Sequence, residues 1–532
     1  MPNINELLRD HVTLEVECID RMYLNGYVPT LQVPGQLISF LVGHRKQPIP
    51  SPVLLGRMTQ KLIQDIKGYA EENETPIVHF KRGQRKDDVA TQMRRKHPVK
   101  DGVVFIGVAQ EKAYAFKSHK KDQSGYVGFE YSRQSVFVNH YYFYLNDAEF
   151  GPAFIKMCSY VPFPIKVYLN GHEWVKRQLE KQRIAFESLD NGFLSCSDPQ
   201  TLQQTCDRLT ALQIEKFFYK WIARLPYPLT EEDQGAGYRH RLSVWQLEVS
   251  LTQVFDRPIR GRQFFEEVIR DNLDQGRPDR IQLLFERKVT KRTPGRFQTR
   301  VIQNGVNPSL HISYKKTDVK QYFKGNRGLR TETTINDPKD FGIGKDICNL
   351  ACLQQIGRNS NRRLLDVQRV SHNCGLCGES IDRVVRATVT EDGQRASGLK
   401  LGDPRVMALF IALTLFGHLV NGFRNAELRS HVADLLDVEY RPTMMTYDLR
   451  RLLRKGIICR VPQTNRYFVT PYGWKVCRFL TRLNTRVFRP TFQAITTPDS
   501  CLYPQPLRKA LHRLDREIDR LIDTVAYVKE AA

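Results

Sequence analysis

The stretch PTMMTYDLRRLLRKGIICRVPQTNRYFV, residues 442–469, is the most informative part of this 532-residue chain for its fold. In its first half, Met445, Leu449 and Leu452 recur at helical spacing, and Gly456 is a typical helix stop. In its second half, two short strand-forming runs flank a Pro-Gln-Thr-Asn turn, a pattern typical of a β-hairpin. The stretch therefore predicts a helix followed directly by a hairpin.

Two more helices are predicted ahead of that stretch. Residues 406–413 are mostly apolar, and residues 425–436 have one apolar face. A last helix follows Gly473. Three helices and then a hairpin, within residues 404–490, is the order of elements in a winged helix, which this part of the chain resembles. We therefore predict a winged-helix module there.

The helix of residues 442–455 also has a polar face, which would lie in a groove of the nucleic acid. The hairpin would lie near the sugar-phosphate backbone. Hydroxyl and guanidinium groups suit base edges and phosphates. The alternative is a protein-docking module whose arginines are simply solvated. The candidate contacts are Thr443, Thr446, Arg450, Arg454, Arg460 and Arg466.

The composition favours a nucleic-acid partner. Lys and Arg number 81 against 57 Asp and Glu, a formal net charge of +24. Hydrophobic residues make up 41% of the chain and aromatic residues 10%, which excludes a disordered basic tail. A globular chain this basic usually neutralises phosphates, here of DNA or structured RNA. Charge that serves only solubility is the alternative. The sequence contains no amphipathic basic helix with a large apolar face, the feature that would indicate binding to a membrane surface.

The sequence predicts a cytoplasmic location. Residues 1–10 are polar and lack the apolar core of a signal peptide. No apolar run approaches the ~18 residues of a transmembrane helix. The eleven cysteines are scattered and do not form a disulfide framework.

We predict a multi-domain α+β protein. Residues 1–230 alternate strand and helix patterns, and the chain becomes strand-rich and basic beyond residue 280. A helical stripe over residues 506–530 would dimerise or dock on the body of the protein. The predicted divisions are an α/β domain (1–230), helices and a basic antiparallel sheet (231–345), a helical connector (346–403), the winged helix (404–490) and a helical tail (491–532).

Within the second division, the pattern predicts helices over 241–255 and 261–273, followed by an antiparallel sheet. One face of that sheet would be basic and aromatic, a platform for a phosphate backbone or unpaired bases. A solvated sheet face is the alternative. The candidate binding residues are Arg296, Arg300, Lys315, Lys316, Lys320, Tyr322, Lys324, Arg327 and Arg330.

Acidic residues at the ends of predicted strands are the main candidates for an active site. Carboxylates from neighbouring strands bind Mg²⁺, which can stabilise the attacking and leaving oxygens of a phosphodiester, with a histidine as general base. Turns and strand ends also carry acids for ordinary reasons. The candidate catalytic residues are Asp20, Glu111, Asp147, Glu149, His172 and Glu173.

Four cysteines form a possible Zn²⁺ site. Cys348 and Cys352 have CxxxC spacing, and Cys374 and Cys377 have CxxC spacing. The alternative is that the first pair lies on a helix as ordinary small residues. Other motifs are missing: the sequence has no GxxxxGK[ST], no GxGxxG, no paired histidines of a nicking endonuclease and no GxSxG.

Four short runs carry a resemblance: YLNGYVP (23–29), GVAQE (107–111), NGHEW (170–174) and LRTETTIN (329–336). They resemble a widespread family of basic bacterial proteins of similar length. The resemblance implies a bacterial protein and no particular activity or site. Residues 314–332 also resemble a segment of phage and plasmid replication proteins, which favours a mobile-element role.

Together these features favour a nucleic-acid-binding protein of mobile-element or genome-maintenance type. Its enzymatic form would be a Mg²⁺-dependent nuclease or strand transferase. The alternative is a non-enzymatic protein, either a DNA-binding regulator or an RNA-binding scaffold of a ribonucleoprotein.

Overall fold

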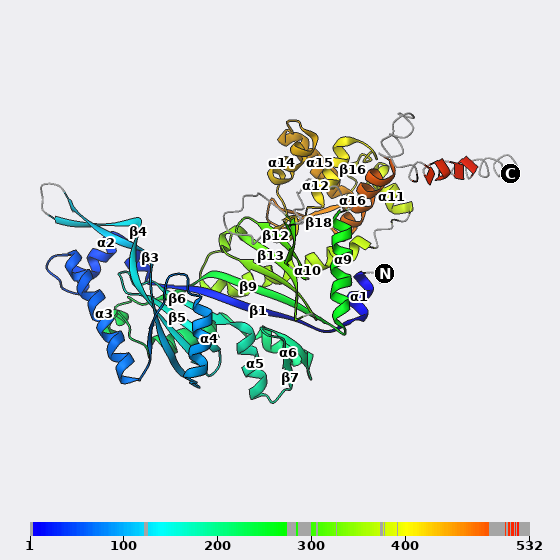
Figure 1. Cartoon of the computed structure of the whole chain (residues 1–532). Coiled ribbons are helices and arrows are strands. Elements are labelled where there is room, and N and C mark those ends of the chain that lie inside the picture. Colours follow the sequence, from blue (N-terminus) through cyan, green and yellow to red (C-terminus); the bar gives the residue numbers. More distant parts are fainter. Residues whose placement is uncertain are drawn as a thin grey trace. The chain divides into compact units, whose positions relative to one another are not determined.

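A computed structural model describes most of the chain, which is a multi-domain α+β protein as predicted (Figure 1). The chain divides into two compact units, the first containing residues 6–264 and 282–363 and the second residues 265–281 and 364 onward. The described residues are 4–121, 126–273, 284–285, 299–304, 307–325, 327–372, 376, 378–390, 392–415, 417–488 and single positions between 506 and 520.

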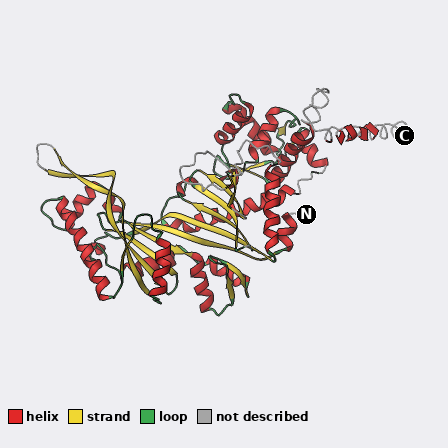
Figure 2. Cartoon of the chain, in the orientation of Figure 1, coloured by secondary structure: helices red, strands yellow, loops and turns green. Residues whose placement is uncertain are grey.

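The first unit is built on a 12-stranded sheet, drawn in yellow in Figure 2, with the order β10-β11-β12-β13-β14-β9-β1-β6-β5-β4-β3-β2. Neighbours are antiparallel except the end pairs β2–β3 and β10–β11. The strands are β1 Val12–Tyr27, β2 Ile77–His79, β3 Gly102–Lys121, β4 Tyr126–Asp147, β5 Gly151–Cys158, β6 Ile165–Asn170, β9 Arg241–Phe255, β10 Leu284–Phe285, β11 Thr299–Asn304, β12 Asn307–Tyr314, β13 Thr317–Lys324 and β14 Gly328–Ile335.

Helices and one small hairpin precede, separate or follow these strands along the chain. The helices up to residue 372 are α1 Ile4–Asp10, α2 Pro34–Ile38, α3 Pro52–Glu72, α4 Lys86–Lys96, α5 Gly171–Lys181, α6 Pro199–Asp207, α7 Ala211–Ile222, α8 Glu231–Gly235, α9 Pro258–Leu273 and α10 Leu350–His372; the hairpin is β7 Phe186–Ser188 with β8 Phe193–Cys196.

Strand β1 pairs with β9 along its length and with β6 along its second half only. The free edge of its first half is covered by α6. There Glu17 N–H donates to Gln203 Oε1 at 2.9 Å, and Gln203 Nε2 donates back to the Glu17 carbonyl at 3.0 Å. The Gln203 side chain thus satisfies the N–H and the carbonyl of Glu17, which the free edge of β1 would otherwise leave without partners.

The predicted helix over residues 241–255 is wrong, because these residues form β9 between β1 and β14. The run Leu-Glu-Val-Ser-Leu-Thr, residues 247–252, alternates apolar and polar side chains, which suits a strand. The strand is paired on both sides and buried along most of its length. Val244, Leu247, Leu251 and Val254 also recur at helical spacing, so the periodicity fits a helix as well as a strand.

The two faces of β9 differ in character. Val249 lies on the face that packs against α10, where a Cβ added to Gly357 would come within 2.7 Å of the Val249 Cβ. Asn361 of the same helix donates to the Val249 carbonyl at 2.9 Å. The opposite face, which carries Glu248 and Ser250, is called the polar face below. The core therefore lies on the α10 side and leaves the polar face for other groups.

In the second unit, the helices and the hairpin follow the predicted order. Met445, Leu449 and Leu452 are buried, as the helical spacing predicted. The tail stripe of residues 506–530 lies mostly outside the described residues. The elements are α11 Gly378–Val385, β15 Thr388–Val389, β16 Arg395–Ala396, α12 Pro404–Leu413, α13 Gly417–Asn421, α14 Asn425–Leu436, α15 Pro442–Arg454, β17 Ile458–Arg460, β18 Tyr467–Val469 and α16 Pro471–Leu483.

No helix within the described ranges combines the length and the apolar character that crossing a membrane requires.

The start of α5 lies unusually close to β1, which generates a stability prediction. A Cβ on Gly171 would lie 2.1 Å from the Ile19 carbonyl oxygen, so Gly171→Ala must push α5 away from the strand. We expect the free energy of unfolding to fall by about 2 kcal/mol, measured by chemical denaturation. Gly68→Ala in α3 is the control, because a Cβ there meets nothing within 4 Å and should be neutral or stabilising. Equal stability of Gly171→Ala and the wild type would contradict this close contact.

Candidate metal centre on the polar face

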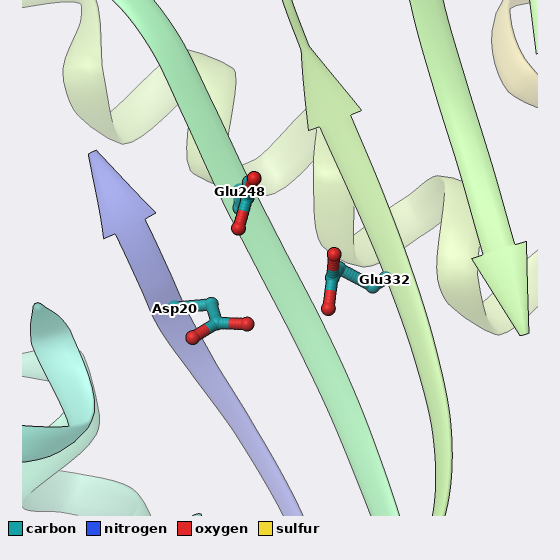
Figure 3. Close-up of side chains that lie close together, drawn as sticks. All are labelled: Asp20, Glu248 and Glu332. Atoms are coloured by element: carbon teal, nitrogen blue, oxygen red, sulfur yellow. The ribbon is translucent and has the colours of Figure 1, made fainter. Parts of the chain in front are cut away.

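Three carboxylates from neighbouring strands meet on the polar face: Asp20 from β1, Glu248 from β9 and Glu332 from β14 (Figure 3). One oxygen of each lies within 4.8 Å of the others. The residues are only 1%, 8% and 5% exposed, respectively. We call them the carboxylate cluster. Carboxylates are almost never buried without a partner, so the cluster needs compensating charge.

Strand register explains why the glutamates meet. Glu332 lies directly opposite Ser250, and Glu248 is two residues from Ser250 along β9. Alternate residues of a strand share a face, so both glutamates point to the same side as diagonal neighbours.

Asp20 reaches the same face through an irregularity in β1. The register between β1 and β9 shifts between Ile19 and Met22, which marks a β-bulge. Because a bulge breaks the simple alternation, Asp20 and Arg21 both contact groups of the polar face. Arg21 Nε lies 2.9 Å from Glu248 Oε2, and its side chain is 44% exposed. The cluster thus has one partly exposed cation at its margin.

Arg330 is the buried cation of the site. Its guanidinium pairs with Asp20, and its Nε lies 3.5 Å from Glu332 Oε2. The same group donates to His172 Nε2 at 2.9 Å and to Ser250 Oγ at 3.2 Å. Arg330 has no exposed surface of its own.

The turn between β7 and β8 covers the Arg330 side of the cluster. Asn191 donates its side-chain amide to Asp20, and its carbonyl accepts from Arg330 at 2.5 Å and from Lys324 at 3.2 Å. Lys176 of α5 donates to the neighbouring carbonyl of Asp190 at 2.9 Å. The turn therefore closes this side, and Arg21 lies on the more open side.

The pKa values show an imbalance of charge within the cluster. Burial and then the proximity of Glu332 raise the pKa of Glu248 to about 7. Burial and then Asp20 raise the pKa of Glu332. Burial also acts to raise the pKa of Asp20, but Arg330 and His172 outweigh it and hold that pKa below its usual value. Two of the three carboxyls would therefore gain from an added cation.

The donor set suits a hard divalent cation. Three carboxylates offer only oxygen, the ligand that Mg²⁺ prefers, and Mg²⁺ is commonly held by few protein ligands and completed by water. Bound at the cluster, the ion would lower the pKa of both glutamates.

Of the six predicted catalytic residues, Asp20 and His172 lie at the cluster. His172 is 1% exposed, with Nε2 3.9 Å from Asp20 Oδ1, so it positions charge rather than meeting solvent. The other four lie elsewhere with partners of their own. They are Glu111, which binds Lys86, Lys156 and Tyr142; Asp147, which accepts from Trp221 and Lys220; Glu149, paired with Lys181; and Glu173, paired with Lys176.

Glu111 is fully compensated by its own neighbours. Burial works to raise its pKa, but hydrogen bonds from Lys156 and Lys86 outweigh this and lower it to about 2. Asp147 closes the β4–β5 turn by accepting from the backbone of Glu149 at 2.8 Å and of Phe150 at 2.9 Å.

The residues of the predicted basic sheet face do not form one surface, because most of their side chains contact different partners within the protein. Tyr322 lies at the cluster, where its hydroxyl donates to Glu332 Oε2 at 3.2 Å, and Lys320 Nζ lies 4.4 Å from its ring centroid. Lys324 pairs with Asp190 at 3.2 Å. Arg296 and the side chain of Arg300 are outside the described residues. The remaining positions are Lys315, bonded to the Asp340 carbonyl; Lys316, paired with Asp337; and Arg327, bonded to the Phe255 carbonyl.

In the second unit, the exposed surface of α15 carries Thr443, Thr446 and Arg450. Arg454 instead donates to the Arg395 carbonyl at 2.8 Å. The hairpin arginines also have local bonds: Arg460 donates to the Thr464 carbonyl at 2.8 Å, and Arg466 donates to the Asn421 carbonyl at 2.8 Å.

Cys348 and Cys352 are exposed, free thiols. Cys374 and Cys377 lie outside the described residues. Among the residues that are described, the carboxylate cluster is the group that brings three potential metal ligands together. The zinc site stays a prediction.

Sequence reasoning missed Glu248 and Glu332. The alternation around Glu248 was a usable signal, but the prediction of a helix over 241–255 hid it. Arg330 and Glu332 are two residues apart in a predicted strand, which put both on one face. Their nearness to Asp20 depends on strand order, which no local pattern contains.

No protein-family model matches the sequence, and no curated protein matches it. A comparison with solved structures gives a rolling circle replication initiator protein from Geobacillus stearothermophilus, at 7% identity and a TM-score of 0.20. The alignment covers 80% of this chain and 99% of that one. At that TM-score the likeness carries no argument about fold or function.

The raised pKa of Glu248 predicts a pH-dependent response to Mg²⁺. Protons and Mg²⁺ compete for this carboxyl, which is mostly protonated at about pH 6 and mostly ionised at about pH 8, because its pKa is about 7. We expect Mg²⁺ to raise the melting temperature more at pH 8 than at pH 6. Without metal, the folded state binds the extra proton from about pH 4.5 to 7, so this group's contribution to stability falls across that window and is level above it.

Differential scanning calorimetry of the wild type and two variants tests this. Glu248→Gln should lose the difference between the two pH values, whereas Glu149→Gln, an exposed glutamate away from the cluster, should keep it. A melting temperature that ignores Mg²⁺ at both pH values would contradict the metal centre.

Proposed function

We propose that this protein processes nucleic acid through a Mg²⁺ ion held by Asp20, Glu248 and Glu332, as a nuclease or strand transferase. The observation that supports this most directly is the meeting of three buried carboxylates from adjacent strands, two of them with raised pKa values. Burial without full compensation is expensive for a fold, and a divalent cation is the ligand that would relieve it.

The charge of the chain supports a polyanionic substrate. The formal net charge is +24, and long-range attraction of this kind favours binding to phosphate backbones. Close to the cluster, Arg21 is the partly exposed cation, and its guanidinium can bind a phosphate oxygen while Glu248 still holds it. The substrate phosphate would thus approach from the Arg21 side.

The proposed reaction is a phosphoryl transfer. A water or hydroxyl oxygen loses its proton and forms a bond to phosphorus, while the bond to one sugar oxygen breaks and that leaving oxygen takes up a proton. A metal ion held by Asp20, Glu248 and Glu332 would supply Lewis-acid stabilisation of these oxygens. Arg21 orients the phosphate, and Arg330, with Asn191, keeps Asp20 ionised and fixed in position. Water as the nucleophile gives a nuclease; a hydroxyl gives a strand transferase.

The second unit would provide a further binding surface for DNA or RNA. Thr443, Thr446 and Arg450 are exposed together on α15, the helix that a winged-helix module places in a groove. This exposure supports contact with nucleic acid, which a mobile-element or genome-maintenance role requires.

A non-enzymatic nucleic-acid-binding protein is the second candidate. The observation that favours it is the fully buried Arg330, which pairs with Asp20 and contacts Glu332. Such a network can serve as a structural ion cluster that joins β1 and β14 across β9. Cleavage assays separate the two candidates.

We expect cleavage of single- and double-stranded oligonucleotides to require Mg²⁺ and to fall at least about 100-fold in Asp20→Asn and Glu332→Gln, since each removes a metal ligand. Denaturing gel electrophoresis of end-labelled substrates measures the rate. Glu149→Gln is the control and should cleave as the wild type does. Tight binding with no cleavage in any divalent ion would instead establish the second candidate.

Arg450→Ala should weaken binding and lower the slope of log affinity against log salt by about 1, as expected for one lost phosphate contact. Fluorescence anisotropy with a labelled duplex over a range of salt measures the slope. Arg386→Ala is the control, because it removes an equally charged, exposed side chain that is not part of α15 and pairs with Asp382. An unchanged slope would remove α15 from the binding surface.

A further inference from the structure

A row of aromatic side chains continues the polar face beyond the carboxylate cluster. Tyr23 of β1, Tyr168 of β6, Phe154 of β5 and Trp245 of β9 form this row, which we call the aromatic strip. The ring centroids of Tyr23 lie 5.0 Å from Tyr168 and 5.9 Å from Trp245. Phe154 stacks on Tyr168 at 5.2 Å with an interplanar angle of 10°. The rings therefore make continuous contact across four strands.

Register places the strip next to the cluster. Tyr23 lies opposite Tyr168, and Tyr168 lies opposite Phe154, so the row runs across the strands. Tyr23 is two residues beyond Arg21 on the same strand, a distance of roughly 7 Å. A ligand on the strip would thus reach Arg21 and then Glu248 without leaving the polar face.

At one end of the strip, Phe154 packs against an aromatic core farther along the sheet. There, Phe105, Tyr142 and Tyr144 are buried and pack with Val89 and Ala90 of α4. At the other end of the strip, Trp245 is 40% exposed although its strand is otherwise mostly buried. A large exposed indole in a central strand has no role in the core.

The positive charge at the strip comes from Lys166 of β6. Lys166 Nζ lies 3.3 Å from the centroid of the Trp245 ring, and no carboxylate within the described ranges forms an ion pair with it. Burial, and then the nearby Lys156, lower the pKa of Lys166 to about 8. A phosphate beside Lys166 would stabilise its charged form.

We propose that the aromatic strip and Lys166 bind unpaired nucleotides, so that the substrate of this protein is a single-stranded nucleic acid led across Trp245 and Tyr23 toward the carboxylate cluster. The path of the nucleic acid toward the carboxylate cluster rests on the proposed function, whereas the binding of a single-stranded nucleic acid to the strip does not. Bases of a duplex have their faces covered by their neighbours, but those of a single strand stack on exposed aromatic rings. Lysines beside the rings then neutralise the backbone.

Intrinsic fluorescence tests this proposal directly. The chain has four tryptophans, and Trp174, Trp221 and Trp474 are at most 5% exposed, against 40% for Trp245. Bases that stack on Trp245 should quench its emission. We expect oligo-dT or oligo-U, added with EDTA to prevent cleavage, to quench saturably, and a duplex of equal length to quench much less. The quenching should disappear in Trp245→Phe.

Binding of a labelled single strand should weaken about tenfold in Trp245→Ala and also in Lys166→Met, by fluorescence anisotropy. Tyr219→Ala is the matched control: it removes an exposed aromatic side chain from α7, away from the polar face, and should bind as the wild type does. Melting temperatures confirm that each variant is folded.

The outcomes separate this inference from the proposed function. If Trp245→Ala binds single strands as tightly as the wild type, or if the duplex quenches equally well, the strip is not the binding platform, even where cleavage still depends on Asp20. If single strands bind and quench through Trp245 but no divalent ion supports cleavage, the strip stands and the proposed nuclease or transferase fails.

Discussion

The buried ion pair between Asp20 and Arg330 is the interaction on which the polar face depends. It joins β1 to β14 across β9, with neither group able to reach water. Removing two charges from water costs several kcal/mol each, and the pair is tolerated only because further hydrogen bonds complete it. Asn191 bonds to both groups, and His172 and Ser250 bond to Arg330. Helix α5 and the β7–β8 turn are thereby tied to the same point.

This pair also sets the chemistry of the site. Arg330 pairs with Asp20 and lowers its pKa. The positive charge that remains is too small to offset the burial of Glu248 and Glu332, so their pKa values are raised. The bulge in β1 supplies Arg21 on one side, where it remains partly exposed. A metal ion and a phosphate would complete the charge from the open side, next to the aromatic strip. The carboxylate cluster and the aromatic strip are therefore two parts of one surface, linked by residues 20–23 of a single strand.

Much of the secondary structure follows from the sequence alone. The C-terminal helices and hairpin have the predicted order. Of the six candidate catalytic residues, Asp20 and His172 lie close together, and the other four lie elsewhere. The strand β9 was missed because its apolar residues fit helical spacing as well as strand alternation, and Glu248 was lost with it. Arg330 was predicted to face nucleic acid, but its side chain is buried, since its carboxylate partner comes from a strand more than half the chain away.

The sequence by itself determined the positive charge, the α+β class and, in the regular strands that it predicted, the face on which a residue lies, because these depend on composition and on local periodicity. The tertiary structure alone decided that Asp20, Glu248 and Glu332 share one site. Their strands are adjacent in the order β14-β9-β1, which does not follow the chain. That order arises from long-range strand pairing and from packing against α10 and α5. A local pattern can place a carboxylate on a face, but only the neighbouring strands supply its partners.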